Sequence, residues 1–472
     1  MRKHHQKEIL SLIQTIEDAQ INGLYAVCQE GAEAIIDFIE SLDIEGLQTI
    51  TLLEQYFQLL FKANQGEIKI KILRDHLIKI KNNVIRELKP TRLEVVFISH
   101  KASMSDSIES IYLAAKEDPD CDAYWIPVPY YEHNTEGKPE TLRFEGADCY
   151  PNIECVDWEQ YDITTRCPDV IFTFSAYDAN NKVSSIHPDF YCQRLREFTD
   201  MLCYVQYFLW NDEPLEHFCK TPACMYAHKV ILPSEKTRNY YMRVFNSVYG
   251  TRFGKHEDRF IALGSPKLDK VFSTKKENCN LPFDWETRIN NKKVILYASS
   301  ISPALQTNVR YIHKLKLMIE YFNNRNDVVL WWRPHPLLEN TFVSVMPTIA
   351  SYYKQIVEDF CRQKRGIYDD TPDLHRAITM GDGYYGDWGS LMFLYQATGK
   401  PAMMADTIID ESMKNVDLGN CLREDKGNVL NDFVDGIVNG SNDDIQLKSF
   451  NKNELVGQKI YKYIKKNLGF TG

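Results

Sequence analysis

Apolar residues follow a helical period through the first part of the chain. Four segments repeat apolar positions every three or four residues, and short polar joints separate them: Glu8–Ala19, Gly31–Ser41, Leu52–Lys62 and Ile68–Leu88. Strand-like runs are scarce here. The pattern predicts a helical region over residues 1–90, which we expect to pack on the rest of the chain or on a second copy.

The pattern changes after Pro90. Leu93–Ser99 is a short apolar run rich in β-branched residues, which is typical of a buried strand, and Lys292–Ala298 starts a second series of the same kind. Strand-like runs that alternate with helix-period segments indicate βαβ units and mainly parallel sheets. The sequence therefore predicts two α/β domains in tandem. We expect them at residues 91–285 and 286–415, followed by a helical segment at 416–472 that packs back on the body.

Composition narrows the function classes. A chain of 472 residues normally forms two or three domains, and a net charge of −10 argues against general nucleic-acid binding. No apolar run reaches the ~18 residues that cross a bilayer, and no strongly basic amphipathic helix stands out. We therefore expect a cytoplasmic protein whose membrane contact, if any, is peripheral, at the inner face.

The 12 cysteines form no CxxC pair and indicate reduced, mostly buried thiols. One local cluster combines two cysteines with two histidines, and its spacing matches no standard zinc site: His217, Cys219, Cys224 and His228. We expect these residues to serve packing, and we expect neither a metal nor a cofactor.

Ligands of open α/β sheets lie beyond the carboxyl ends of the strands, so the residues that follow each strand carry the candidate chemistry. In the second domain a buried strand runs directly into Arg333 and His335, which two prolines flank. Alternation along the strand lets both side chains face one side, where arginine and histidine can bind phosphate. Ser299 and Ser300 follow the first strand of this domain and predict a small loop that admits a phosphate. The alternative interpretations, in which these residues bind no ligand, are a capped strand end and an ordinary serine turn.

A glycine-rich segment precedes a later helix of the same domain. Gly386, Gly389 and Ser390 allow close backbone approach and leave amides free at the helix start, where phosphate binds well. Asp387 could order a ribose or an acceptor hydroxyl. A plain helix cap remains the alternative.

The first domain offers weaker candidates. His100 and Lys101 follow its opening strand, and Ser234 precedes a helix at an equivalent edge position. A single histidine at such a position is as often structural as functional. No GxGxxG, P-loop or GxSxG motif supports a nicotinamide enzyme, an NTPase or an elbow hydrolase.

Taken in order, these pieces resemble the CDP-glycerol glycerophosphotransferase family over roughly residues 200–405. The resemblance is carried by Val230–Glu235, Leu263–Asp269, Val294–Ala298, Arg333–Pro336 and Tyr385–Ser390 ahead of Gly399–Pro401. It implies a GT-B-like fold, in which two Rossmann-like domains face a cleft. It also implies that His335 binds the donor pyrophosphate, and that Asp387, Gly389 and Ser390 hold the phosphate or glycerol end beside the two serines.

The sequence departs from the family at two places. The family motif WHGTPxK, whose histidine is taken as the acceptor base, should fall near residues 204–210, where no histidine stands. The loop after Ala298 also reads ASSIS instead of APTxR. The resemblance thus leaves the acceptor base open, with His100 as the replacement candidate, and it leaves open whether the transferred group is glycerol phosphate.

The leading hypothesis is the transfer of a polyol phosphate from a CDP-activated donor to a hydroxyl of a glycan or lipid-linked acceptor in cell-surface polymer synthesis. Two alternatives remain. One is a GT-B glycosyltransferase that uses a nucleotide sugar, and the other is a non-catalytic scaffold in which the missing histidine marks a decayed site.

Overall fold

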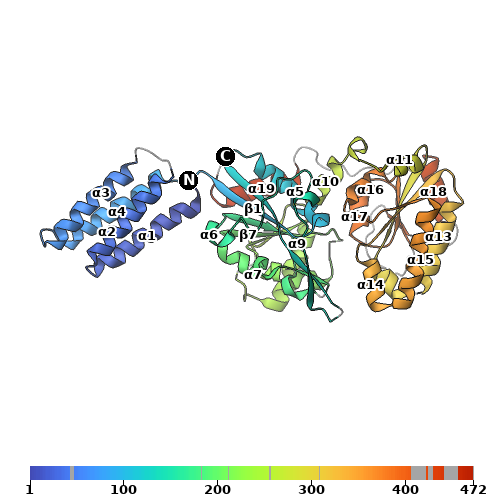
Figure 1. The fold of residues 1–472 in the computed structure, drawn as a ribbon, viewed down its shortest axis with the longest axis horizontal. Helices are drawn as coiled ribbons and strands as arrows, with labels where there is room; N and C mark the ends of the chain where they lie inside the picture. Colours follow the sequence, from blue (N-terminus) through green and yellow to red (C-terminus); the bar gives the residue numbers. More distant parts are fainter. Residues whose placement is uncertain are drawn as a thin grey trace.

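The computed structural model describes residues 1–42, 47–134, 136–181, 183–210, 212–254, 257–307, 309–405, 421–423, 429–440 and 455–470. Figure 1 shows three parts in a row: an N-terminal helical bundle, a first α/β domain and a second α/β domain. The mixed α/β class and the two Rossmann-like domains agree with the expectation from the sequence.

The bundle consists of α1 (Lys3–Ile21), α2 (Tyr25–Glu40), α3 (Gln48–Asn64) and α4 (Ile70–Glu87). Helices α1 and α3 each pack against both α2 and α4, so α2 and α4 occupy diagonal corners. Their buried residues recur at helical spacing, as Ile9, Ile13 and Ile16 do in α1, which is why the period was visible in the sequence. The bundle is tied to the first domain where Arg2 forms an ion pair with the buried Glu94 at 3.1 Å.

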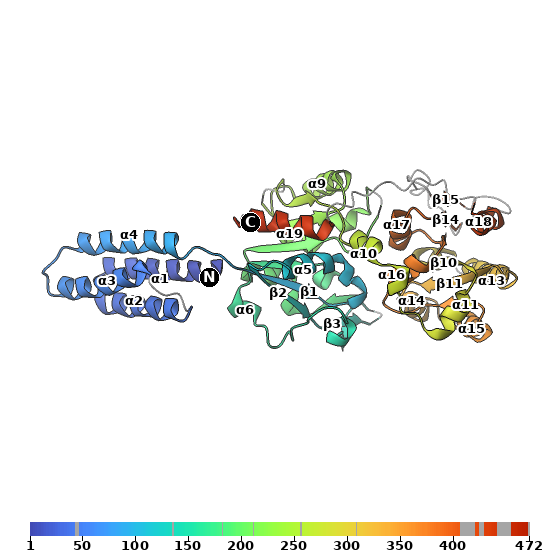
Figure 2. The same ribbon diagram turned by 90° about the horizontal axis from the view of Figure 1, so that it is seen from above.

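The first domain contains a six-stranded parallel sheet in the order β2-β1-β5-β7-β8-β9. Its strands are β1 (Leu93–Ser99), β2 (Cys121–Pro127), β5 (Val170–Thr173), β7 (Met201–Val205), β8 (Lys229–Leu232) and β9 (Phe260–Ala262). Helices α5 (Glu109–Lys116) and α19 (Val456–Asn467) lie together on one face, and α9 (Glu235–Tyr249) covers the other. The C-terminal helix therefore returns to the first domain (Figure 2).

The second domain contains another six-stranded parallel sheet, in the order β12-β11-β10-β13-β14-β15. Its strands are β10 (Lys293–Ser299), β11 (Val328–Pro334), β12 (Ile367–Tyr368), β13 (Gly383–Gly386), β14 (Ala402–Met404) and β15 (Cys421–Arg423). One face packs against α13 (Val309–Asn323), α15 (Pro347–Gln363) and α18 (Val429–Val438). The other packs against α16 (Leu374–Met380), α17 (Ser390–Ala397) and α10 (Lys267–Ser273), the last of which follows β9 in the chain.

Two helices follow β11 in place of a single long one, because α14 (Leu338–Val345) stops before Pro347 opens α15. A small antiparallel sheet of β4 (Pro139–Arg143), β3 (Tyr130–His133) and β6 (Ser184–Ile186) was not expected. Much of the predicted segment 416–472 lies outside the described residues.

Candidate functional site

Three neighbouring strands of the second sheet end side by side. Because β11, β10 and β13 are adjacent and parallel, the residues after them meet at one edge. The His335 amide donates to the Ser299 carbonyl at 2.9 Å, and the Ser300 amide donates to Asp387 Oδ2 at 2.7 Å. The structure thus brings together four residues that the sequence placed on three separate segments.

The start of α17 joins the same edge. The Ser300 hydroxyl donates to the Trp388 carbonyl at 3.2 Å, and a Cβ on Gly389 would lie 3.2 Å from Ser300 Oγ. Ser390 is the first residue of α17, so the first amides of this helix adjoin the serine loop. The RPHP turn and the helix after Trp388 therefore reach the same edge of the sheet.

Gly386 serves the sheet itself. A Cβ at this position would lie 2.5 Å from the Ala298 carbonyl oxygen on β10, which leaves no room for a side chain. The close approach expected from the sequence is therefore to a neighbouring strand, and Gly386 contributes to the site by letting β13 lie tightly against β10.

We expect Gly386→Ala to separate β13 from β10 and to destabilise the protein by roughly 1–3 kcal/mol, the usual cost of overpacking. Urea unfolding monitored by circular dichroism measures this. An unfolding midpoint for Gly386→Ala equal to that of the parent would contradict the packing argument.

The His335 ring is held in one orientation. Its Nδ1 accepts a hydrogen bond from the Leu337 amide at 3.2 Å, so the neutral ring carries its proton on Nε2. The side chain is exposed to solvent, yet surrounding protein and the charge of Lys101 lower its pKa. His335 therefore offers an N–H donor to a ligand in its neutral form.

Arg333 is engaged inside the second domain. Its guanidinium is buried, pairs with the fully buried Asp369 at 2.9 Å and donates to the Thr371 carbonyl at 2.6 Å. Arg333 is therefore held inside the domain, whereas His335 is exposed to solvent. The expectation of a joint Arg333 and His335 clamp is therefore corrected: Arg333 fixes the loop after β12.

Asp387 is also buried, with no exposed surface. Besides holding the Ser300 amide, it donates its own amide to the Ala298 carbonyl at 2.9 Å. Its carboxylate thus fixes the serine loop through the hydrogen bond from the Ser300 amide.

His100 and Lys101 follow β1 at the edge of the first sheet. The His100 ring lies 5.0 Å from the Phe174 ring, and its Nδ1 is buried with no hydrogen-bond partner among the described residues. Burial and the charge of Lys101 lower the pKa of His100 to about 3, so the ring is neutral. The Lys101 ammonium lies over the Tyr130 ring at 4.7 Å, and burial lowers its pKa as well.

Ser234 acts as a helix cap. Its hydroxyl accepts from the Thr237 amide at 3.1 Å, at the start of α9, and donates to Asp212 at 2.9 Å. These bonds keep it within the first domain, and none of them connects it to the serine loop of the second.

A buried charged cluster joins the two domains, and no motif in the sequence indicates it. Asp106 lies in the 3₁₀ turn η1 (Ala102–Ser107). Its Oδ1 accepts a hydrogen bond from the Lys267 ammonium of α10, and its Oδ2 lies 2.7 Å from His375 Nε2 on α16. All three side chains are at most 5% exposed. Lys267 and His375 lie 161 and 269 residues from Asp106 in the chain, so only the folded structure reveals the cluster.

The segment where the family histidine was expected also contacts the second domain. The Trp210 ring lies 6.0 Å from the Trp388 ring and 6.3 Å from the Phe393 ring. In the first domain, Cys219 and Cys224 are buried in the hydrophobic core. Within the residues that the structure describes, no group of histidine, cysteine and acidic side chains could hold a metal ion.

Comparison with known families now adds to this geometry. Residues 225–411 match the family described as CDP-Glycerol:Poly(glycerophosphate) glycerophosphotransferase. This segment is similar to that family. The resemblance inferred from the sequence is thereby confirmed, and the matched segment includes His335, the serine loop and the start of α17, whereas His100 and Lys101 precede it.

Solved structures share the fold of this chain. A putative UDP-N-acetylglucosamine 2-epimerase from Listeria monocytogenes is 14% identical with a TM-score of 0.52, over 81% of this chain and 98% of its own. The S. aureus MnaA-UDP co-structure is 12% identical with a TM-score of 0.51, over 80% and 98%. The wall teichoic acid polymerase TagF is 14% identical with a TM-score of 0.48, over 90% and 99%. At these identities the epimerase likeness shows the fold alone.

A comparison with curated protein sequences finds no match. Among the described helices, none combines the length and the apolar character that a membrane crossing requires.

Proposed function

We propose that this protein transfers a polyol phosphate, glycerol phosphate or a relative of it, from a CDP-activated donor to a hydroxyl of a glycan or lipid-linked acceptor. The family match supports the reaction class. The geometry supports the binding of a phosphate where the two sheets face each other.

One observation carries the proposal. Lys101 of the first domain lies close enough to His335 of the second for its charge to lower the pKa of that histidine. Lys101 supplies a cation and the neutral His335 supplies an Nε2–H donor, and the serine loop and the first amides of α17 adjoin His335. A pyrophosphate bound beside them would be stabilised by the ammonium charge and by these N–H groups.

In this proposal the chain's residues divide the work of phosphoryl transfer. The acceptor oxygen attacks the phosphorus that carries the polyol, the bond from that phosphorus to the CMP oxygen breaks, and the acceptor proton passes to a base. Nε2–H of His335 and the Lys101 ammonium stabilise charge on the pyrophosphate oxygens. Gly389 and Ser390 hold the phosphate through backbone N–H groups and the Ser390 hydroxyl, and Ser300 shapes the loop beside them.

We propose His100 as the base. Its ring is neutral in the free protein, and its buried Nδ1 lacks a partner among the described residues. Because the charge of Lys101 contributes to its low pKa, the negative phosphates of a bound donor would raise the proton affinity of His100 when it is needed. Arg333 and Asp387 are positioning residues in this scheme, and Ser234 caps α9.

A donor panel tests the reaction class. Isothermal calorimetry with CDP-glycerol, CDP-ribitol, UDP-sugars and CMP should show binding of the CDP-polyols, followed by release of CMP when a hydroxyl acceptor is added. A preference for UDP-sugars would replace the proposal by glycosyl transfer, and the absence of nucleotide binding would favour a scaffold.

Removing the Lys101 charge should act on both the donor and His335. We expect Lys101→Met to weaken binding of a CDP-polyol roughly tenfold. The same variant should raise the pKa of His335, because the cation that lowers it is gone. NMR titration of the histidine ring protons, with His335→Asn for assignment, measures the second effect. An unchanged His335 titration would contradict the opposition of these two side chains.

A further inference from the structure

The small antiparallel sheet of the first domain, which the sequence did not predict, lies against the loop that carries His100 and Lys101. The Lys101 ammonium donates to the Ser184 hydroxyl of β6 at 3.3 Å and lies over the Tyr130 ring of β3 at 4.7 Å. The His100 ring lies 6.2 Å from the same tyrosine ring. The small sheet therefore contacts both candidate residues of this loop.

One carboxylate joins the small sheet to the loop. Glu145 follows β4; its Oε1 accepts from the Tyr130 hydroxyl at 3.1 Å, and its Oε2 accepts from the Ala102 amide at 2.7 Å. Ala102 is the first residue of η1, directly after Lys101. Both oxygens of the Glu145 carboxylate are therefore engaged, and they fix the backbone where the loop leaves Lys101.

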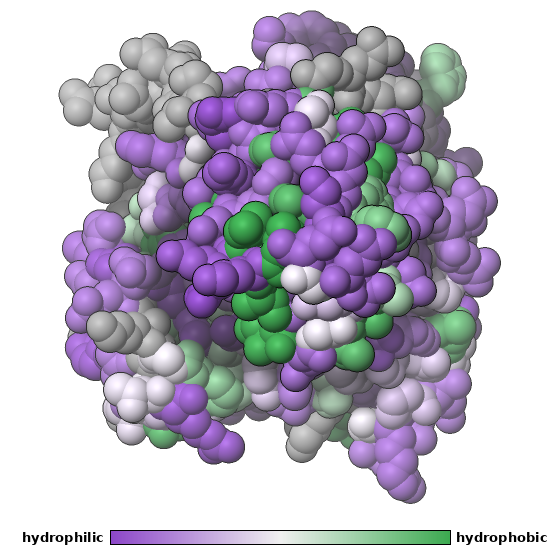
Figure 3. All heavy atoms as spheres, turned by 90° about the vertical axis from the view of Figure 1, so that its left-hand side faces the viewer, coloured by the Kyte–Doolittle hydropathy of each residue, from purple (hydrophilic) through white to green (hydrophobic). Residues whose placement is uncertain are grey.

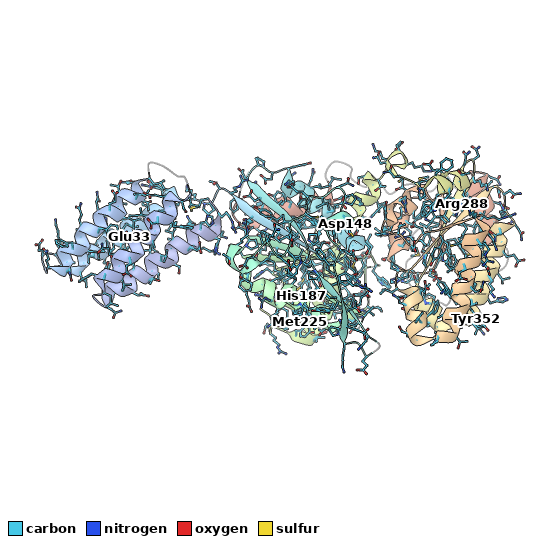
Figure 4. The ribbon with its side chains drawn as sticks, viewed as in Figure 1. Glu33, Asp148, His187, Met225, Arg288 and Tyr352 are labelled. Atoms are coloured by element: carbon cyan, nitrogen blue, oxygen red, sulfur yellow. The ribbon has the colours of Figure 1, made fainter. Side chains whose placement is uncertain are left out.

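The segment around Glu145 lies at the face of the first domain where a donor would bind. Figure 4 labels Asp148, three residues farther along in η2 (Ala147–Cys149), on the side of the first domain that is turned toward the second. Lys101 lies on this side as well, because its charge reaches His335 of the second domain. Glu145 thus acts on the loop at the interdomain face.

Glu145 also supplies negative charge beside Lys101. Burial lowers the pKa of Lys101, and the charges of Glu145 and Glu132 raise it again. The charge of Glu132 is shared, because its carboxylate also pairs with Arg143 at 2.9 Å. Glu145 is therefore the carboxylate that does most to keep Lys101 protonated.

Three further titratable groups face Lys101: His100 on its own loop, Tyr130 on β3 and His335 of the second domain. Burial and the Lys101 charge lower the pKa of both histidines, so both rings are neutral near pH 7. Tyr130 donates a hydrogen bond to Glu145. Lys101 is thus the cation among these residues, and Glu145 is its counter-charge.

We propose that Glu145 is a positioning residue that holds His100 and Lys101 in place for phosphate transfer and keeps Lys101 charged where the donor binds. The inference rests on the proposed function, and Glu145 precedes the segment that matches the family. An anionic donor is attracted by Lys101 only while the lysine is protonated, and a partly buried ammonium keeps its proton more readily beside a negative charge. One carboxylate that both bonds the loop and supplies this charge meets both requirements.

The charge is tested in the free protein, with no donor present. Glu145→Gln keeps a side-chain oxygen that can accept a hydrogen bond and removes the negative charge. NMR titration of the lysine side chains, with Lys101→Met for assignment, should show Lys101 losing its proton at a lower pH in Glu145→Gln than in the parent. An unchanged Lys101 titration would overturn the inference. Because no nucleotide takes part, this result does not depend on the proposed reaction.

Two other carboxylates serve as controls. Asp148→Asn removes an exposed charge near Glu145, and Glu33→Gln removes one from the exposed side of α2. Figure 4 labels Glu33 on the bundle, the part farthest from the second domain, and Figure 3 looks onto that end and shows hydrophilic side chains over most of it. Both controls should titrate like the parent. A shift as large in Asp148→Asn as in Glu145→Gln would overturn the inference in favour of the general charge of the loop.

The pH dependence of donor binding has a definite sign. Protonated Lys101 attracts the donor, so affinity for CDP-glycerol is highest below the pKa of Lys101 and falls as the pH rises through it. Loss of the Glu145 charge lowers this pKa, so the fall should occur at a lower pH in Glu145→Gln than in the parent. Isothermal calorimetry at a series of pH values measures this, and superimposable profiles would contradict the role of Glu145.

Turnover tests the positioning. Glu145→Ala removes both hydrogen bonds and should slow transfer from CDP-glycerol on the order of 100-fold, because small displacements of reacting groups cost about that factor. Glu145→Gln retains an acceptor and should lose roughly tenfold, so it also carries the test if Glu145→Ala fails to fold by circular dichroism. Parent-like turnover in both variants would overturn the positioning role. An inactive parent protein would contradict the proposed reaction instead, and the Lys101 titration would still decide the role of the Glu145 charge.

Discussion

Replacing His335 by alanine should lower turnover with a CDP-polyol donor by roughly two orders of magnitude or more. Removal of one hydrogen-bond donor that stabilises developing charge in a preorganised site slows a reaction by about that factor. The Nε2–H group is fixed by the bond from the Leu337 amide to Nδ1. Single-turnover release of CMP measures the chemical step directly.

A second substitution separates chemistry from structure. In His335→Asn the side-chain oxygen can still accept from the Leu337 amide, so the turn into α14 is kept while the Nε2 donor is lost. We expect this variant to be as slow as His335→Ala. His313→Ala, on an exposed position of α13, should turn over like the parent. Normal turnover in His335→Asn would remove the imidazole from the reaction.

The alternation of strands and helices was readable because it depends on local patterns. Buried strands such as Val294–Ala298 are continuous apolar runs, and the bundle helices bury residues at regular spacing, as Leu73, Leu77 and Ile80 do in α4. The meeting of Ser299, His335 and Asp387 followed from a topological rule, because carboxyl ends of parallel strands share an edge.

What could not be read was the direction of individual side chains. Arg333 and His335 are two residues apart, yet Arg333 forms an ion pair with the buried carboxylate of Asp369. The sequence around Arg333 contains no pattern that indicates this partner. Gly386 was expected to admit a ligand and instead admits the β10 backbone. Both differences arise from contacts between residues distant in the chain, which pattern alone does not encode.

The cluster around Asp106 is the extreme case, and it connects stability to the site. Asp106 lies on the turn that begins directly after Lys101, and its partners lie on α10 and on α16 of the second domain. Burial alone would raise the pKa of Asp106, but the charge of Lys267 and the hydrogen bond from His375 hold it well below its usual value. The carboxylate is therefore charged, and it fixes the turn that carries Lys101 against the domain that carries His335.

We expect Asp106→Ala to destabilise the protein by about 3–5 kcal/mol, because it leaves the ammonium of Lys267, only 4% exposed, without a partner. Glu109→Ala is the matched control: it removes the nearby Lys270 pair at 2.6 Å, whose lysine is 35% exposed, and should cost at most about 1 kcal/mol. Urea unfolding followed by tryptophan fluorescence compares the two.

The pH dependence gives this prediction its sign. A carboxyl whose folded pKa is depressed stabilises the protein at pH values above its unfolded pKa, and the stabilisation is lost as the pH falls through the folded pKa. The difference in stability between the parent and Asp106→Ala should therefore be largest near neutral pH and shrink in acid. The Asp106 cluster also fixes the turn after Lys101 against the domain that carries His335. The Asp106→Ala variant should therefore bind a CDP-polyol more weakly than the parent under conditions where the variant is fully folded. Equal midpoints for Asp106→Ala and Glu109→Ala would show that the buried cluster contributes no more than a surface pair, and the coupling between domain contact and donor binding would fall with it.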